Sequence, residues 1–255
     1  MLKGFFMNKQ NLLGIIILAI LLVCLIILTI AVFSPKDQGE ETPVPEVPVD
    51  VPVEVDVVLP LTTDAGQEYL DKLYFVGEST TSHFFKGGID RSHILVPASA
   101  TLTLGSDILQ ILVGSKELTI PQAVKDADAE ILIITLGVNN ASRFTEKQYK
   151  TYYGKLIDAI KEASPSTTII LQSTFPVTES FSNKGTAITN EAIDRNNEWA
   201  KEIAKDYGLR YLDTQSILKN EHGAQIEEYG NGDGVHLNED AYKAILYYIR
   251  THAVE

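Results

Sequence analysis

The longest uncharged stretch of the chain lies near its start. Residues 12–33 are almost entirely Leu, Ile, Val and Ala, without a formal charge. As a helix at ~1.5 Å per residue they would extend ~33 Å, enough to cross a hydrocarbon core of ~30 Å. Lys3 and Lys9 precede this stretch and the acidic segment 35–41 follows it. By the positive-inside rule, the pattern predicts a single-pass anchor with residues 1–11 in the cytoplasm and the rest outside.

A cleaved signal peptide is the alternative interpretation of this stretch. Its apolar region would be shorter, about 7–15 residues, and would end at an Ala-x-Ala-like site. The sequence from Ala31 to Ser34 does not fit that site. Cys24 follows Val23 in the middle of the stretch, which does not fit a lipoprotein site, so we interpret it as a lipid-facing or packing residue.

Residues 34–60 have a different pattern, in which six prolines are spaced among valines and acidic side chains. The alternating valines would suit a strand, but repeated proline removes the N–H groups that a ladder needs. Seven acidic side chains against one lysine add like-charge repulsion. The segment is therefore predicted to be an extended linker between the anchor and a globular domain at residues 61–255.

The rest of the chain alternates short apolar runs with helical patterns. Continuous runs of Ile, Leu and Val are typical of parallel strands that are covered on both faces. The predicted strands are residues 73–76, 93–96, 131–136, 168–173 and 210–213.

Three longer segments between and after these strands have apolar residues at helical spacing. They are residues 145–163, 189–207 and 238–252, with Gly208 as a C-terminal cap and Asn238 as an N-cap. Such alternation predicts a three-layer α/β/α sandwich with a mostly parallel five-stranded sheet, preceded by one transmembrane helix. In such a sheet the functional site lies beyond the carboxyl ends of the strands.

Composition narrows the possible functions. The chain has 255 residues and a formal net charge of −13, which argues against nucleic acid as a partner because phosphates require a basic surface. The single cysteine lies within the predicted span and excludes both an intramolecular disulfide framework and a Cys-rich zinc site. No grouping of His, Asp and Glu has convincing metal-ligand spacing, so we expect neither a metal nor a cofactor.

Three segments at predicted strand ends or helix starts carry candidate chemistry. Ser79 follows the first strand, where its hydroxyl would lie near backbone N–H groups, although an ordinary turn or N-cap serine fits the same position. Asp233 and His236 stand three apart just before the last helix, so the carboxylate could fix the imidazole tautomer and leave Nε2 to accept a proton. A chance pair in a surface loop is the alternative.

Asn139 follows the most apolar strand, in the sequence Gly137-Val138-Asn139-Asn140. A side-chain amide there can donate to a developing oxyanion, although Gly and Asn are also common in ordinary turns. His83 lies four residues after Ser79 and could line the same site; we interpret it as a partly exposed helix residue.

Taken together, in order and spacing, these segments resemble the SGNH/GDSL hydrolase family over about residues 70–252. The resemblance implies that Ser79 is the nucleophile, His236 the general base and acid, and Asp233 the carboxylate that orients it. It also implies that Asn139 and the Ser79 backbone N–H are oxyanion donors.

The chain departs from the family pattern at three points. Glu78 replaces the usual Asp before the serine, and Asn140 replaces the Asp of the Gly-x-Asn-Asp motif. The glycine that supplies a further oxyanion N–H has no clear counterpart. Ala100 stands in the corresponding region and is our candidate for it, with Gly105 as the other choice.

The sequence thus predicts a membrane-anchored, extracytoplasmic serine esterase that acts on acyl esters such as an O-acetylated cell-wall glycan. An O-acetyltransferase that uses the same acyl-enzyme is one alternative. A non-catalytic surface binding module is another, because Glu78 and Asn140 depart from the motifs. The oligomeric state is not predicted.

Overall fold

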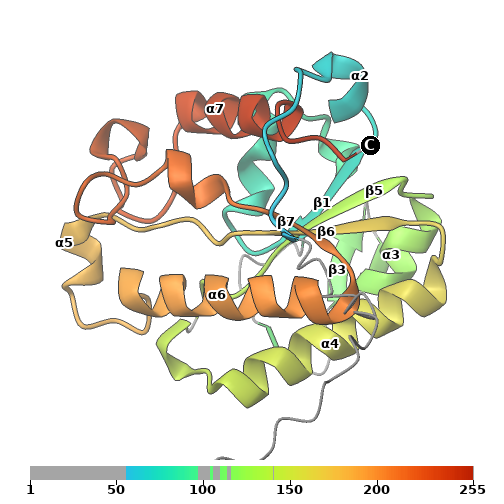
Figure 1. The fold of residues 1–255 in the computed structure, drawn as a ribbon, viewed down its shortest axis with the longest axis horizontal. Helices are drawn as coiled ribbons and strands as arrows, with labels where there is room; N and C mark the ends of the chain where they lie inside the picture. The colour runs from blue at the N-terminus through green and yellow to red at the C-terminus, as the bar shows by residue number, and fades with distance from the viewer. Residues whose placement is uncertain (1–55, 97–103, 106–109, 114–115, 140, 255) are drawn as a thin grey trace, which may run out of the picture. The chain divides into compact units, whose positions relative to one another are not determined.

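A computed structural model describes residues 56–96, 104–105, 110–113, 116–139 and 141–254 of the chain. Its central feature is a five-stranded sheet in the order β2-β1-β5-β6-β7 (Figure 1), with every neighbouring pair parallel. All five strands lie at the predicted apolar runs, and the sheet is entirely rather than mostly parallel. The strands are β1 (Leu73–Gly77), β2 (Ile94–Leu95), β5 (Ile131–Thr135), β6 (Thr168–Gln172) and β7 (Arg210–Leu212).

Helices cover both faces of this sheet. In Figure 1, α4 and α6 lie on one side of the strands, and α2 and α7 lie on the other. The bounds are α2 (Gly66–Leu70), α3 (Ile120–Asp126), α4 (Glu146–Ala163), α5 (Glu179–Ser182), α6 (Asn190–Tyr207) and α7 (Glu239–Arg250). Short 3-10 helices are η1 (Thr81–Gly87), η2 (Arg91–His93), η3 (Ala141–Arg143), η4 (Thr214–Ile217) and η5 (Glu227–Tyr229).

Alternate residues of the central strand β5 enter two separate cores. Ile131 and Ile133 pack with α2, η1 and α7, whereas Leu132 and Ile134 pack with α3, α4 and α6. All four side chains are at most 6% exposed. Full burial of an Ile or Leu side chain stabilises a fold by about 1.5–3 kcal/mol, so both cores hold the sheet in register. The three-layer α/β/α arrangement follows from this alternation.

The long helices begin where the sequence predicts; α4 and α6 also end there, whereas α7 ends at Arg250, two residues earlier than predicted. Thr145 forms a capping box with Gln148 at the start of α4, and Asn238 accepts the Ala241 N–H at the start of α7. Gly208 ends α6 with a φ of +64°, a left-handed conformation that glycine adopts without strain.

Besides the short helices α2 and α5, which were not predicted, two features of the fold differ from the prediction. An antiparallel hairpin of β3 (Gln110–Val113) and β4 (Lys116–Thr119) leads into α3, and none of these three elements was expected. Residues 57–59, within the segment predicted as linker, pair with the edge of the sheet: Tyr211 N donates to Val57 O and Leu59 N donates to Tyr211 O, both at 2.9 Å. Leu59 is buried, so the folded domain begins before residue 61.

The membrane prediction falls outside the part of the chain that the structure describes. Residues 1–11, the span 12–33 and most of the linker precede Asp56, the first described residue. Among the described residues, no helix combines the length and apolar character needed to cross a membrane.

The close approach of β1 and β5 requires glycine at position 77, where Gly77 pairs with Thr135. A Cβ atom on Gly77 would lie 2.0 Å from Thr81 Oγ1 and 2.5 Å from the Thr135 carbonyl oxygen. We therefore expect Gly77→Ala to lower the free energy of unfolding by about 3 kcal/mol, because backbone must move to admit a methyl group.

Urea denaturation measures this effect through the fluorescence of Trp199, the single tryptophan of the chain. Gly185→Ala is the control, because nothing lies within 4 Å of its Cβ position, although Gly185, unlike Gly77, has a positive φ. It should cost only about 1 kcal/mol of left-handed strain. Equal losses in the two variants would contradict the steric argument.

Candidate active site

Ser79 lies in the turn that leads from β1 into η1. Its backbone carbonyl accepts the Ser82 N–H at 3.2 Å and the Ser82 hydroxyl at 2.6 Å. The next residue is held from α7, because the Tyr242 hydroxyl donates to the Thr80 carbonyl at 2.6 Å. These bonds hold the backbone at and directly after the serine, which lies just beyond the carboxyl end of β1.

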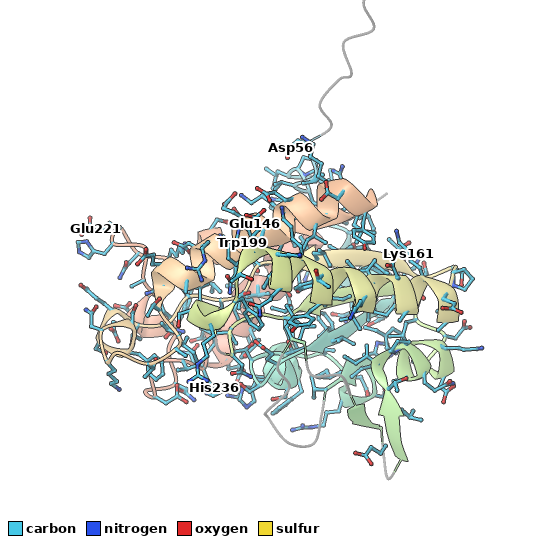
Figure 2. All side chains as sticks on the ribbon, turned by 90° about the horizontal axis from the view of Figure 1, so that it is seen from below. Asp56, Glu146, Lys161, Trp199, Glu221 and His236 are labelled. Carbon is cyan, nitrogen blue, oxygen red and sulfur yellow. The ribbon has the colours of Figure 1, made fainter. Side chains whose placement is uncertain are left out.

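His236 brings the C-terminal part of the chain to this serine. It lies at the outer rim of the folded domain (Figure 2), and its Nε2 is 2.9 Å from Ser79 Oγ. Its Nδ1 is 2.7 Å from Asp233 Oδ2. Ser79, His236 and Asp233, the three residues that the resemblance implied, thus form one hydrogen-bonded chain in the structure. They do so although 157 positions separate Ser79 from His236.

Asp233 is held ionised by the turn that it forms. Its Oδ1 accepts the backbone N–H groups of Val235 at 2.7 Å and of His236 at 2.8 Å. Partial burial acts to raise the pKa of Asp233, but these bonds, with those from the His236 ring and Asn231, outweigh it and hold the pKa well below its usual range. The imidazole therefore faces a permanent negative charge at neutral pH.

Glu78 is the carboxylate next to the serine, and it is almost completely buried, at 1% exposure. Its Oε2 accepts the N–H of Val138 at 2.6 Å and that of Asn139 at 3.1 Å. Burial raises the pKa of Glu78 to about 7, against the lowering effect of the N–H groups of Asn139, Val138 and Gly137. From the sequence, Glu78 was only a departure from a motif; the structure shows that it connects the two strand ends.

His83 contacts the candidate base, as one of its sequence interpretations allowed. Its ring lies edge-on to that of His236, with centroids 5.3 Å apart, and its side chain is only partly buried. Desolvation is the largest cause that lowers the pKa of His83, with the charges of Lys86 and His236 adding to it, so the ring favours its neutral form.

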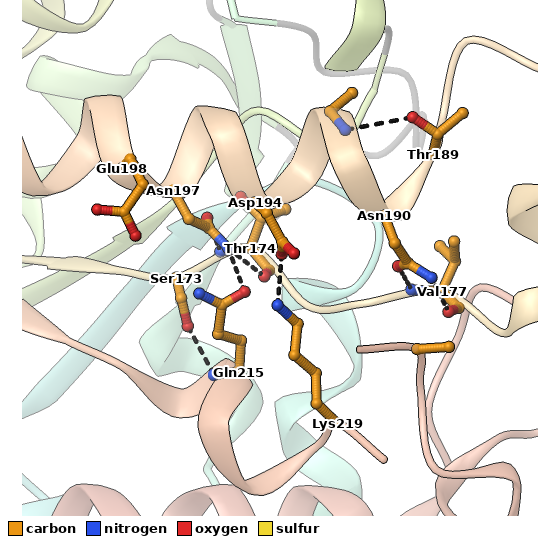
Figure 3. Close-up of polar contacts among 12 residues, drawn as sticks. Ser173, Thr174, Val177, Thr189, Asn190, Asp194, Asn197, Glu198, Gln215 and Lys219 are labelled. Atoms are coloured by element: carbon orange, nitrogen blue, oxygen red, sulfur yellow. Dashed lines mark hydrogen bonds and ion pairs between the residues drawn. The ribbon is translucent and has the colours of Figure 1, made fainter. Parts of the chain in front are cut away.

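Helix α6 supports the loop that follows β6 (Figure 3). Asn197 accepts the Thr174 N–H at 2.8 Å and donates to the Thr174 carbonyl at 3.0 Å. In the same way, Asn190 accepts the Val177 N–H and donates to the Val177 carbonyl, both at 2.9 Å. The Thr178 N–H donates to the Gly234 carbonyl at 2.9 Å. Residues 174–178, held by α6, therefore support the turn that carries Asp233 and His236.

The sequence model of the GDSL-like lipase/acylhydrolase family matches residues 100–244. This chain belongs to that family. The matched range contains Asn139, Asp233 and His236 and begins after Ser79. The evidence that Ser79 belongs to the site is therefore its hydrogen bond to His236, not the family match. No curated protein matches the chain in sequence.

Two solved structures are similar to this chain in fold. A GDSL-like lipase from Bacteroides thetaiotaomicron is 16% identical, with a TM-score of 0.52 over 76% of this chain and 89% of that one. A protein described as a platelet activating factor from Streptococcus pneumonia is also 16% identical, with a TM-score of 0.51 over 72% of this chain and 88% of that one. At this identity, the two likenesses show the fold alone.

The two candidates for the further oxyanion N–H lie in the stretch of sequence between β2 and β3. Ala100, our candidate for it, lies outside the described residues. Gly105, the other choice, has a φ of +88°, and a Cβ there would lie 2.4 Å from the Tyr152 ring. Among the described residues, no group of three or more His, Cys, Asp or Glu side chains could hold a metal ion.

The buried amide of Asn197 generates a test of the α6 support. Asn197→Ala would leave the Thr174 N–H and C=O without these partners, so we expect the free energy of unfolding to fall by about 2–3 kcal/mol. Asn183→Ala, at an exposed position, should change it by less than about 0.5 kcal/mol. Urea titration of both variants measures the difference, and a neutral Asn197→Ala would contradict the assigned role.

Proposed function

We propose that this chain is a serine esterase that hydrolyses short-chain acyl esters through an acyl-enzyme on Ser79. The observation that carries the proposal is the hydrogen-bonded chain from Ser79 Oγ through His236 to Asp233, with distances of 2.9 and 2.7 Å. A serine hydroxyl is a weak nucleophile unless a base accepts its proton, and His236 Nε2 lies within hydrogen-bond reach of it. Membership of a lipase and acylhydrolase family supports ester chemistry at this site.

The proposed reaction proceeds in two stages. Ser79 Oγ attacks the ester carbonyl carbon while His236 Nε2 takes the hydroxyl proton, and negative charge develops on the carbonyl oxygen. The bond to the alcohol oxygen then breaks, and the alcohol leaves with the proton from His236. Water, deprotonated by the same Nε2, attacks the acyl-enzyme and releases the carboxylic acid and free Ser79.

Four groups stabilise charge in this scheme. Ionised Asp233 favours the imidazolium form of His236 and fixes the tautomer whose Nε2 faces Ser79. The Ser79 N–H, which has no hydrogen-bond acceptor among the described residues, and the Asn139 amide are the proposed donors to the oxyanion. Ala100 is our candidate for the further N–H donor that the family resemblance implies, with Gly105 as the other choice.

The proposed setting of the reaction is the outer side of the cell membrane. The apolar stretch 12–33, the lysines before it and the acidic, proline-rich linker after it support an anchored extracytoplasmic domain. An enzyme in that position would meet acyl esters of the cell envelope, and an O-acetylated glycan is the substrate that we propose.

Removing the nucleophile tests the reaction. In the full-length protein, Ser79→Ala should lower kcat on a short-chain aryl ester at least about 10³-fold, because no other group replaces Oγ. A fluorophosphonate probe should label Ser79 in the wild type, detected by mass spectrometry. Ser92→Ala, an exposed serine on the same segment, is the control and should retain full activity. Unchanged hydrolysis by Ser79→Ala would contradict the assignment.

The same assay separates the two alternatives. A binding module would neither hydrolyse the ester nor accept the probe at Ser79. An O-acetyltransferase would accept the probe but release little free acid from the donor alone, and would acetylate an added glycan. Product analysis with donor alone and with donor plus glycan distinguishes water from a sugar hydroxyl as the acceptor.

The anchor makes a separate prediction. The full-length protein should fractionate with membranes, resist extraction at high salt, and be released by detergent, because ~22 apolar residues hold a span far more tightly than surface charge does. Protease added to intact cells should digest the domain. A soluble form that begins near residue 34 would instead support the cleaved signal peptide.

A further inference from the structure

Glu78 is a buried titratable group that the proposed reaction does not use. It lies between Gly77, the last residue of β1, and Ser79, and its side chain turns away from solvent. Its Oε2 bonds to two successive backbone N–H groups of the segment after β5, those of Val138 and Asn139. One carboxylate oxygen therefore joins the turn that carries the serine to the loop that carries Asn139.

The start of this loop is fixed from the opposite side. The hydroxyl groups of Tyr149 and Tyr153 donate to the Leu136 carbonyl at 3.1 and 3.2 Å. Gly137 has a φ of +120°, and a Cβ there would lie 2.8 Å from Tyr149, so the chain turns sharply against α4. Asn196 of α6 donates to the Gly137 and Ala141 carbonyls on either side of the next residues, at 3.3 and 3.1 Å. Between these two points, Glu78 accepts the N–H groups of Val138 and Asn139.

We propose that Glu78 is a positioning residue: its carboxylate holds the Val138–Asn139 backbone beside Ser79, and thereby orients the Asn139 amide toward the developing oxyanion. The inference rests on the proposed function, because it concerns the same acyl transfer. Glu78 itself would touch neither the substrate nor the reacting atoms. It would act through Asn139, and only on interactions that strengthen in the transition state.

The length of the side chain is part of this assignment. From the β1 end, the glutamate side chain makes both bonds, at 2.6 and 3.1 Å. An aspartate, the usual residue of the family motif, is shorter by one methylene, about 1.5 Å, so it would not reach both N–H groups without backbone movement. A glutamine has the same length and keeps a carbonyl oxygen as acceptor.

The charge of Glu78 changes the strength of this contact. The titratable groups that face it are Tyr149 and Tyr153 of α4, whose own pKa values burial raises, so both stay neutral. Because burial raises the pKa of Glu78 to about 7, the carboxyl loses its proton near neutral pH. An ionised carboxylate accepts stronger hydrogen bonds than a neutral carboxyl, so the loop should be held more tightly as pH rises through 7.

Kinetics of length and charge variants in the full-length protein test the proposal. At pH 8, Glu78→Asp should lower kcat by about tenfold or more with little change in KM, because a misplaced oxyanion donor weakens transition-state binding. Glu78→Gln should stay within about threefold of the wild type. In an Asn139→Ala background, Glu78→Asp should add less than about a twofold loss. A full loss in that background, or wild-type kcat in Glu78→Asp, would overturn the proposal.

Amide hydrogen exchange gives a readout that does not depend on catalysis. Peptides covering residues 136–140 should exchange faster in Glu78→Asp than in the wild type. Should Glu78→Asp not fold, the glutamine variant decides. The wild type should be better protected than Glu78→Gln at pH 8 and equal to it at pH 5.5, and the same ratio at both pH values would overturn the proposal. A wild type that shows the pH-dependent protection but no ester hydrolysis would refute the proposed function alone.

Discussion

The parallel register of β1 against β5 is the constraint on which the site depends. Gly77 pairs with Thr135 at the ends of these strands, so the residues that follow each strand emerge side by side at one edge of the sheet. Ser79 follows one strand and Asn139 the other, which makes neighbours of residues 60 positions apart. A slip of one residue would turn the side chains of β1 and β5 to opposite cores. The packing of both sheet faces therefore also determines which residues meet at the site.

Each half of the candidate catalytic apparatus is supported from a different layer of the sandwich. Tyr242 of α7 bonds to the turn of the serine from one side of the sheet, whereas α6, on the other side, supports the turn of the imidazole through Thr178 and Gly234. The 2.9 Å contact between Ser79 and His236 forms between these two supported turns. Its geometry is thus set by both cores, and pre-organisation of this kind is what a nucleophile–base pair needs.

Much of this arrangement could be predicted from the sequence, because it follows from local patterns. The five apolar runs and the caps at Thr145, Asn238 and Gly208 mark the elements directly, and the order of Ser79, Asn139, Asp233 and His236 indicated one site. The β3–β4 hairpin, the pairing of residues 57–59 with Tyr211 and the burial of Glu78 were not predicted. Each depends on which distant surface a short segment meets, and neither hydropathy nor spacing contains that information.

The two carboxylates near Ser79 show how environment separates the roles of similar groups. Asp233 has a side chain that is 47% exposed and is surrounded by donors, so its pKa lies well below the usual range and its charge is constant at neutral pH. Glu78 has fewer donors and almost no water, and burial raises its pKa to about 7. Because that value lies above the ordinary carboxylate range, ionisation of Glu78 costs folding stability as pH rises through 7. Asp233, which orients the base, is thus always charged at neutral pH. Glu78, which holds the Asn139 loop, becomes charged only at a cost in folding free energy. The N–H groups of Val138 and Asn139 offset part of that cost.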